Sequence, residues 1–169
     1  DTTYMAQWRR ITYDMVFNAA GGTGGVTLQL AYGEPLNPPT VTRPGYVFAG
    51  WSPTVPQTVP EENMTFTALW SLALFTITFD ANGGVGGTSE LRAYNDDLSA
   101  PSVWREGHTF AGWSPAVPAK VPMANTVYTA QWTVNSYTIT FNANGGSGGT
   151  TGTYTYGTPL QAPAVTRPG

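Results

Sequence analysis

The sequence contains no cysteine and a single histidine, and charged residues make up only 10% of it. Without cysteine the chain can form no disulfide, thiol nucleophile or cysteine metal site, and one histidine excludes a histidine-rich metal site. Because charged residues usually supply about 25% of a chain, neutral polar residues must cover most of the surface. These absences weigh against an enzyme, and we expect no cofactor.

Helical periodicity and long apolar runs are also absent. No window places apolar residues at the spacing of a helix, and no apolar run approaches the roughly 20 residues of a membrane span. The 7 lysine and arginine residues are scattered and form no basic stripe of the kind typical of nucleic-acid binders. We therefore expect an all-β protein with no nucleic-acid partner and no membrane span in this segment.

Aromatic residues are plentiful and recur at a fixed step of 62 residues, with no insertion or deletion. This step relates the following tryptophans and phenylalanines: Trp8, Trp70, Trp132, Phe17, Phe79 and Phe141. A fixed period indicates near-identical folded units. We divide the chain into the last strand of a preceding repeat (1–8), two complete repeats (9–70 and 71–132) and the first part of a further repeat (133–169).

The chain begins and ends within a repeat, and two explanations compete. Either the sequence is an excerpt from a longer array, or its N-terminal strand completes the partial repeat of a neighbouring molecule. The two fragments together lack the counterparts of residues 46–62, which include Tyr46, Phe48 and Trp51. Because a unit completed by a neighbour would lack these expected core residues, we favour the excerpt.

Each repeat is expected to hold four strands. Residues 75–79 and 137–141 alternate apolar residues with threonine, the pattern of a half-buried strand. The glycine-rich segment after it predicts a hairpin or wide turn, and the second strand ends near Tyr32 or its counterparts. Residues 46–51 and 65–70 are the third and fourth strands, joined by a loop that is paced by prolines.

The segment between the second and third strands is rich in proline. Residues 36–45 cannot form a helix, because prolines lack the amide donor and fix φ. We expect an extended crossing with Leu36 and Val41 directed inward.

The recurring rings are expected to form the core of a unit that would otherwise be marginal at this size. Burying one such side chain is worth roughly 1.5–3 kcal/mol. Only four residues separate Trp70 from Phe75, so we expect neighbouring repeats of the chain to contact each other and to form a stiff, elongated rod. The expected core residues are Phe17, Tyr32, Phe48, Trp51, Trp70, Phe79, Tyr94, Phe110, Trp113, Trp132, Phe141 and Tyr156.

Five sequence blocks recur in a fixed order, and together they resemble a known family. The blocks stand at residues 137–146, 32–33, 43–46, 48–51 and 129–132. In order and spacing they resemble the Listeria–Bacteroides repeat, also called the internalin B-repeat family, over the whole chain. The resemblance implies small β-grasp-like units in large cell-surface or secreted proteins, often as tandem stalks between a cell anchor and a distal adhesive domain. It supplies no catalytic residues.

Three departures from the family pattern weaken any transfer of a binding function. Residues 105–108 read Arg-Glu-Gly-His in place of Arg-Pro-Gly-Tyr, and Ala20 replaces the asparagine of the first glycine turn. The Gly-Trp block is followed by Ser-Pro and a run of Val-Pro pairs, where many members carry a longer polar loop.

Trp104 is the most distinctive candidate for binding. It stands where the other repeats have Thr42 and Thr166, so folding needs no large apolar group there and we expect the ring to be partly exposed. It could be a sugar-stacking platform or a contact between chains, since aromatic rings carry much interface energy. The alternative is that it covers a neighbouring part of the core.

Arg43, Arg105 and Arg167 recur in a chain that is poor in charge. We expect them to brace the loop through carbonyls or a carboxylate, and a regularly spaced anion-binding row is the alternative. The glycine turns lack the helix and lysine of phosphate-binding loops. Asp96-Asp97 is interpreted as a solvated turn.

Two further residues, His108 and Asn63, stand out in the comparison of the repeats. His108 occupies the place of Tyr46 and is interpreted as a packing substitute. Asn63 begins a glycosylation sequon that the next repeat lacks.

Together these observations predict a structural spacer, stalk or fibre segment of a large extracellular or cell-surface protein, without chemistry. A module that binds a glycan or a protein through Trp104 or the arginines is the alternative. Other copies in a fibre, or a host or cell-surface glycan or protein, are the partners considered.

Overall fold

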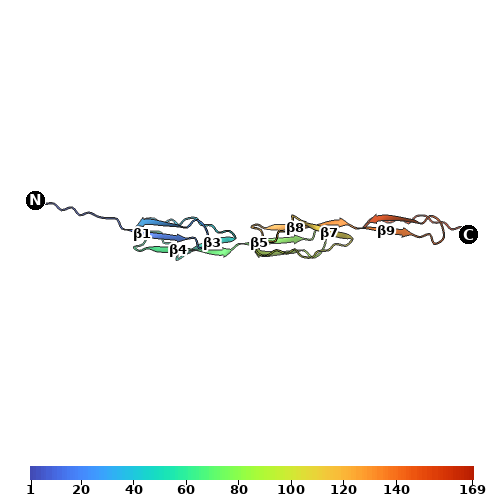
Figure 1. The fold of residues 1–169 in the computed structure, drawn as a ribbon, viewed down its shortest axis with the longest axis horizontal. Coiled ribbons are helices and arrows are strands. Elements are labelled where there is room, and N and C mark those ends of the chain that lie inside the picture. Colours follow the sequence, from blue (N-terminus) through green and yellow to red (C-terminus); the bar gives the residue numbers. More distant parts are fainter. The chain divides into compact units, whose positions relative to one another are not determined.

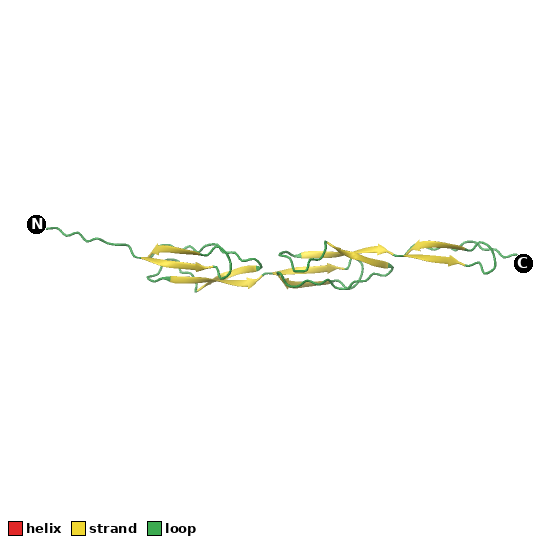
Figure 2. Ribbon diagram, viewed as in Figure 1, coloured by secondary structure: helices red, strands yellow, loops and turns green.

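The computed structural model describes residues 1–169 and contains ten strands and no helix (Figures 1 and 2). The chain divides into two compact units, residues 1–74 and 75–169, and each is described by itself. The absence of helices confirms the all-β prediction. The all-β fold follows from the alternation of apolar and polar residues along short segments that are separated by glycine and proline.

The first unit is a four-stranded mixed sheet with the order β2-β1-β4-β3. The two central strands, β1 and β4, run parallel, and the outer strands pair with them antiparallel. This arrangement agrees with the small β-grasp-like unit that the family resemblance implies. Its strands are β1 (Thr12–Asn18), β2 (Val26–Ala31), β3 (Tyr46–Ser52) and β4 (Met64–Leu72).

The second unit repeats this sheet and adds a hairpin. The sheet order β6-β5-β8-β7 again has a parallel central pair, β5 and β8. The hairpin pairs β9 and β10 antiparallel, without counterparts of the third and fourth strands. The strands are β5 (Leu74–Asp80), which begins at the unit boundary, β6 (Thr88–Ala93), β7 (His108–Ser114), β8 (Thr126–Val134), β9 (Ser136–Phe141) and β10 (Thr150–Thr155).

The expected repeat boundaries fall inside strands of this structure. β4 continues past Trp70 to Leu72, and β8 continues past Trp132 to Val134. The closing tryptophan block therefore lies within the fourth strand of each complete repeat and is not its end. A single residue then separates each of these strands from the first strand of the next repeat.

The core of each complete repeat lies on one face of its sheet. In the first repeat Phe17 and Phe66 are stacked with their ring centroids 5.0 Å apart, and Trp51 meets Phe17 edge-on at 5.1 Å. Leu36 and Val41 are 5% and 7% exposed, which confirms that the proline-rich crossing directs them inward. The cluster in the second repeat consists of Ile77, Phe79, Leu98, Val121 and Tyr128.

Four of the expected core rings lie at the surface, so those predictions are wrong. Tyr32 is 62% exposed, because β2 ends at Ala31, which turns inward and is 4% exposed. The remaining three rings lie on the outside of other rings and not beneath them: Phe48, Phe110 and Tyr156. Phe48, for example, packs against the edges of Trp51 and Trp70 but stays 40% exposed.

The other expected core rings are buried or half-buried. Phe17 and Phe79 are 1% and 3% exposed. Phe141 is only half-buried, since no fourth strand covers β9. The remaining half-buried rings are Trp51, Trp70, Tyr94, Trp113 and Trp132.

Candidate functional site

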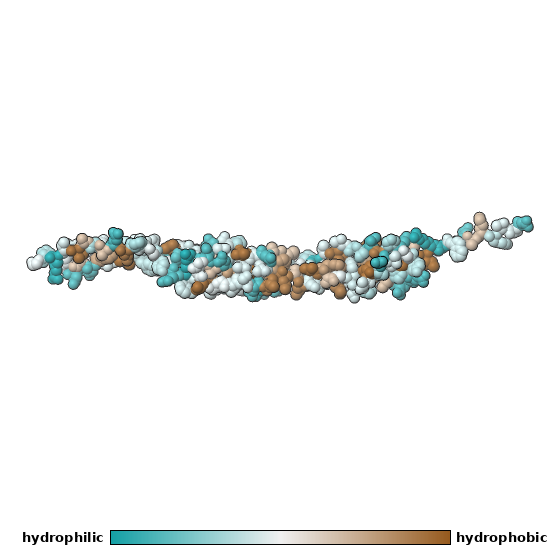
Figure 3. Space-filling view, turned by 180° about the vertical axis from the view of Figure 1, so that it is seen from behind, coloured by the Kyte–Doolittle hydropathy of each residue, from teal (hydrophilic) through white to brown (hydrophobic).

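The structure buries no polar or charged residue. No group of three or more histidine, aspartate or glutamate residues could hold a metal ion, and no helix is long and apolar enough to cross a membrane. The surface is mostly pale, with scattered apolar and polar patches (Figure 3). The candidate sites are therefore surface features: the turn arginines, Trp104, the repeat junction and the strand edges.

The arginines of the two complete repeats hold the glycine turns. The Arg43 Nη1 donates to the Ala20 carbonyl at 3.2 Å, and its guanidinium lies 3.9 Å from the centre of the Tyr46 ring. The Arg105 Nη1 donates to the Asn82 carbonyl at 3.2 Å. These are the carbonyl contacts that the bracing interpretation requires. An ideal Cβ built at Gly145 would meet no atom within 4 Å, so Arg167 does not lie over the corresponding turn.

The glycine turns are also tied to the fourth strand. The indole N–H of Trp70 donates to the Ala19 carbonyl at 2.9 Å, and that of Trp132 donates to the Ala81 carbonyl at the same distance. The tryptophan ring lies so close to Gly22 that a side chain there would meet it at 2.8 Å. The turns are thus packing elements, which accounts for their glycine without a ligand.

Trp104 is 63% exposed, as the sequence predicts. Its backbone pairs with Val85 through hydrogen bonds of 2.9 and 3.1 Å. In the first repeat the same bridge joins Thr23 to Thr42, whose hydroxyl groups lie 3.0 Å apart. The second repeat has replaced a hydroxyl pair with an apolar pair. The backbone of Trp104 is thus held by the bridge to Val85, while most of its ring is exposed to solvent.

The junction between the second repeat and the hairpin is a single residue, Asn135, which is bonded on both sides. Its N–H donates to the Gly107 carbonyl at 2.8 Å, and its own carbonyl accepts the Tyr156 N–H at 2.8 Å. Its side-chain oxygen accepts from the Thr109 hydroxyl at 2.6 Å. The connection is therefore part of the fold on either side of it and is not a free linker.

Tyr156 closes this junction from the hairpin side. Its ring lies directly over Gly107, and its centroid is 6.1 Å from that of His108. The Glu106 carboxylate and partial desolvation raise the pKa of Tyr156 above its ordinary value, with desolvation the larger cause. His108 itself forms a hydrogen bond of 2.7 Å with the Glu106 carbonyl. The histidine thus packs in the place of Tyr46, as the sequence suggests.

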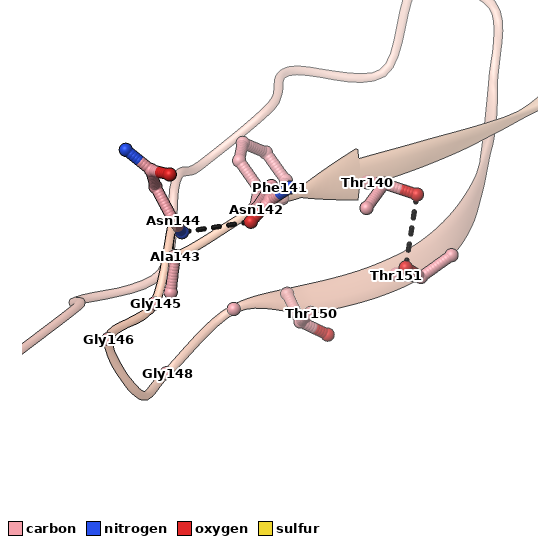
Figure 4. A pocket seen from close by; sticks show the side chains of 11 residues that line it. Thr140, Phe141, Asn142, Ala143, Asn144, Gly145, Gly146, Gly148, Thr150 and Thr151 are labelled. Carbon is pink, nitrogen blue, oxygen red and sulfur yellow. Dashed lines mark hydrogen bonds between the residues drawn. The ribbon is translucent and has the colours of Figure 1, made fainter.

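The outer edge of β9 is open. An open hollow of about 440 Å³ lies between the end of β9, the glycine turn and the start of β10 (Figure 4). In the figure the Thr140 and Thr151 hydroxyl groups face each other across the hairpin at 3.0 Å. The complete repeats place the fourth strand along this edge, and there Phe79, the counterpart of Phe141, is 3% exposed.

Residues 1–10 have no strand partner in the structure. Tyr4, Met5 and Trp8 are 91%, 87% and 94% exposed. In sequence, residues 2–8 match residues 126–132 of β8, with threonine, tyrosine, alanine, glutamine and tryptophan at the same positions. A segment with the sequence of a fourth strand is thus present without a sheet.

Sequence reasoning missed two parts of this arrangement. Val59 and Val121, each 1% exposed, belong to the cores although they lie in the proline-paced loops. Their recurrence at the step of 62 residues, amid polar neighbours, was the available signal. The second missed part is Asn135, whose counterpart Ala73 differs in side chain, so no sequence signal pointed to it.

Asn63 has a structural role. Its side-chain oxygen accepts the Asp14 N–H at 2.8 Å, and Asn125 accepts the Thr76 N–H at the same distance. Both asparagines therefore join the start of the fourth strand to the first strand. Asp96-Asp97 follows the turn at residues 94–95, and Asp97 bridges to Lys120, whose ammonium lies 2.8 Å from its carboxylate and lowers the pKa of Asp97.

Three curated relatives share the sequence over much of the chain. A predicted Gly-rich membrane protein of Evansella cellulosilytica is 32% identical over 86% of this chain and 19% of its own length. A predicted membrane protein of the same organism is 27% identical over 96% of the chain and 27% of its own length. Internalin H of Listeria monocytogenes is 29% identical over 73% of the chain and 25% of its own length. The chain thus spans about a quarter or less of these relatives.

No solved structure matches the chain. The model of the Listeria-Bacteroides repeat domain matches residues 13–68, 75–133 and 137–169. These three segments cover most of the first sheet, most of the second sheet and most of the hairpin. The period of 62 residues, the mixed sheets and the family blocks therefore agree. The chain belongs to the Listeria-Bacteroides repeat family, of which it carries tandem copies.

Proposed function

We propose that this chain is a spacer segment of a larger extracellular or cell-surface protein, and that its tandem units supply length and stiffness and no chemistry. The observation that carries the proposal is the junction at Asn135. Both backbone groups of this residue are hydrogen-bonded, one to each side of the junction. A connection of this kind restricts bending between neighbours, which a spacer requires and an enzyme does not.

Further support comes from the chemistry of the surface and from the relatives. Charged residues are sparse, and no histidine, aspartate, glutamate or lysine is buried where it could serve as an acid, base or nucleophile. Two relatives are described as membrane proteins and a third as an internalin. A stalk between an anchor and a distal domain, as in an adhesin, suits these descriptions.

The test is the thermal unfolding of chains with one, two and three complete repeats. If neighbours stabilise each other through their junctions, the midpoint rises with repeat number, as it does for other arrays with nearest-neighbour coupling. Equal midpoints would contradict the proposal, because the units would then unfold independently and be joined only by flexible linkers.

The exposure of Trp104 supports a second candidate, a module that binds a glycan or protein. A glycan array would test this candidate by comparing the unmodified full chain with the variant Trp104→Ala. The matched control is Val85→Thr, which changes the other residue of the Val85–Trp104 bridge. A signal that Trp104→Ala removes and Val85→Thr retains would favour binding. If the unmodified chain gives no signal, the binding candidate is rejected and the spacer role is retained.

A further inference from the structure

The second repeat has an open hollow of about 580 Å³ at the end of β5, which we call the β5 hollow. Ile77 and Phe79 of β5 are buried, so the alternating residues Thr78 and Asp80 lie on the face of the sheet away from the core, where they line the hollow. The volume is within the range of about 300–1,000 Å³ that is typical of small-ligand sites. The hollow is lined by residues 78–81, 84–89 and 127.

The residues that line or adjoin the β5 hollow differ from those of the other repeats at four positions. Three of these differences replace a hydroxyl-bearing side chain with an apolar one, and the fourth replaces a neutral amide with a carboxylate. The second repeat thus has an apolar surface with one negative charge where the others are neutral and polar. The differences, at the step of 62 residues, are Val85 for Thr23 and Ser147, Trp104 for Thr42 and Thr166, Val127 for Thr65, and Asp80 for Asn18 and Asn142.

Trp104 adjoins the β5 hollow through its bridge to Val85. In the first repeat the hydroxyl groups of the corresponding residues, Thr23 and Thr42, lie 3.0 Å apart, so the two side chains of this bridge lie on the same side. The Trp104 indole therefore lies beside the Val85 side chain, which lines the hollow. The two side chains are 63% and 51% exposed. A free indole face is thus available next to the hollow.

Building on the second candidate function, we propose that Trp104 and the β5 hollow together bind a neutral oligosaccharide, in which one sugar ring stacks on the indole and the next lies in the hollow. A pyranose ring has an apolar face of C–H groups, which the negative face of an aromatic ring attracts. Its rim carries hydroxyl groups. The hollow offers them the Asp80 carboxylate and the hydroxyl groups of Thr78 and Ser89, which lie 2.8 Å apart.

The turn uses only one oxygen of the Asp80 carboxylate. This Oδ1 accepts the Asn82 N–H at 2.8 Å, and Asn18 and Asn142 accept the corresponding N–H groups in the other repeats. The turn therefore forms equally well with asparagine and does not require a carboxylate. A carboxylate accepts a hydroxyl hydrogen bond that is roughly twice as strong as one to a neutral acceptor. Asp80 thus suits a ligand that is rich in hydroxyl groups.

The size and the charge of this surface favour a neutral sugar over other ligands. A stable protein interface takes about 20–30 residues from each partner, which is many more than the side chains gathered at the β5 hollow. The Asp80 carboxylate and the net charge of −3 oppose the binding of acidic sugars and phosphate groups. Neutral sugar rings have no such penalty and are small enough for the site.

The experiment is calorimetric titration of the full chain with neutral hexasaccharides of glucose, mannose and galactose, and with the acidic hexamer of galacturonic acid. We expect at least one neutral probe to bind at a single site per chain, and the acidic probe not to bind. Trp104→Thr, which introduces the residue of both other repeats, should weaken binding about tenfold or more because it removes the stacking ring.

Two further variants test the β5 hollow separately from the tryptophan. Asp80→Asn introduces the residue of both other repeats and keeps the turn, and it should weaken binding about threefold or more. Val127→Gln places a longer neutral side chain at a position that is 54% exposed, so it fills the hollow without disturbing the core and should weaken binding similarly. Asp96→Asn, which removes an exposed carboxylate elsewhere on the repeat, is the matched control and should bind normally.

Three results would overturn the proposal. The first is that no neutral probe binds, and the second is that the acidic probe binds more tightly than the neutral ones. The third is that Trp104→Thr abolishes binding while Asp80→Asn and Val127→Gln leave it unchanged. In that third case the second candidate function stands, because Trp104 binds the sugar without the β5 hollow.

Discussion

The ring of Tyr156 lies over Gly107 so closely that a methyl group on that glycine would overlap it. Tyr156 belongs to the segment after β10, and Gly107 precedes β7 of the repeat before it. The two residues are 49 positions apart and meet only because Asn135 joins the repeat and the hairpin without slack. This contact is the most direct sign that neighbouring repeats pack on each other.

We predict that Gly107→Ala detaches the hairpin from the second repeat. A two-stranded hairpin is at best marginally stable alone, so β9 and β10 should lose their amide protection once Tyr156 is displaced. Hydrogen exchange followed by mass spectrometry on the full chain measures this loss, while the sheets of the complete repeats should keep their protection.

Gly157→Ala is the matched control for that experiment. Gly107 and Gly157 have φ values of 68° and 81°, so alanine costs roughly 1–2 kcal/mol of backbone strain at either position. Only Gly107 has a ring against it, since nothing lies within 4 Å of a Cβ built at Gly157. If both variants lose the same amide protection, backbone strain and not the loss of the Tyr156–Gly107 contact causes the effect.

Trp132→Phe should lower the free energy of unfolding of the second repeat by about 0.5–1.5 kcal/mol, because it removes the indole hydrogen bond to the Ala81 carbonyl, which then keeps only the Gly84 N–H as a donor. Ala81 is 8% exposed, so water replaces that bond poorly. Urea unfolding of the full chain measures the change. Trp104→Phe removes an indole N–H from an exposed ring and should alter stability by less than about 0.5 kcal/mol. An equal effect of the two substitutions would rule out the proposed role of the turn contact.

Alkaline pH should weaken the second repeat through Tyr128. Burial raises the pKa of this phenol above its ordinary value of 10.0, so the folded state favours the neutral form. Its contribution to stability is complete below pH 10.0 and falls as the pH rises above that value, because only the unfolded chain ionises there readily. Tyr128→Phe, which copies Phe66 of the first repeat, should flatten the fall.

Unfolding free energies measured from pH 8 to 11.5 would show whether stability falls as the pH rises. Tyr32→Phe serves as the control, since Tyr32 is 62% exposed and its replacement removes no buried phenol. A profile of Tyr128→Phe that runs parallel to that of the unmodified chain would contradict the assignment.

The strands and turns were predictable because each has a local cause. Alternation between threonine and apolar residues at 75–79 defines β5, and Asn-Gly at 82–83 adopts the positive φ that the turn needs. The parallel pairing of β1 with β4 was not predictable, because no short-range pattern records which strands of a mixed sheet are neighbours.

Recurrence alone did not identify the core. Tyr32 and Phe17 recur at the same step, yet Tyr32 is 62% exposed and Phe17 is 1% exposed. Identical units repeat their surface as faithfully as their interior, so a period cannot distinguish the two. Val59 shows the converse, because its burial depends on a loop that folds back on the sheet and makes backbone bonds with Glu34 and Gly33.

The central claim is that tandem units supply a fixed length through tied junctions. Small-angle X-ray scattering on chains with two, three and four complete repeats tests it most directly. If the junctions are tied, the maximum dimension should grow by the same increment with each repeat, of about 27 Å or more on compact-domain scaling. A dimension that grows ever more slowly with repeat number, as for units on flexible linkers, would contradict it.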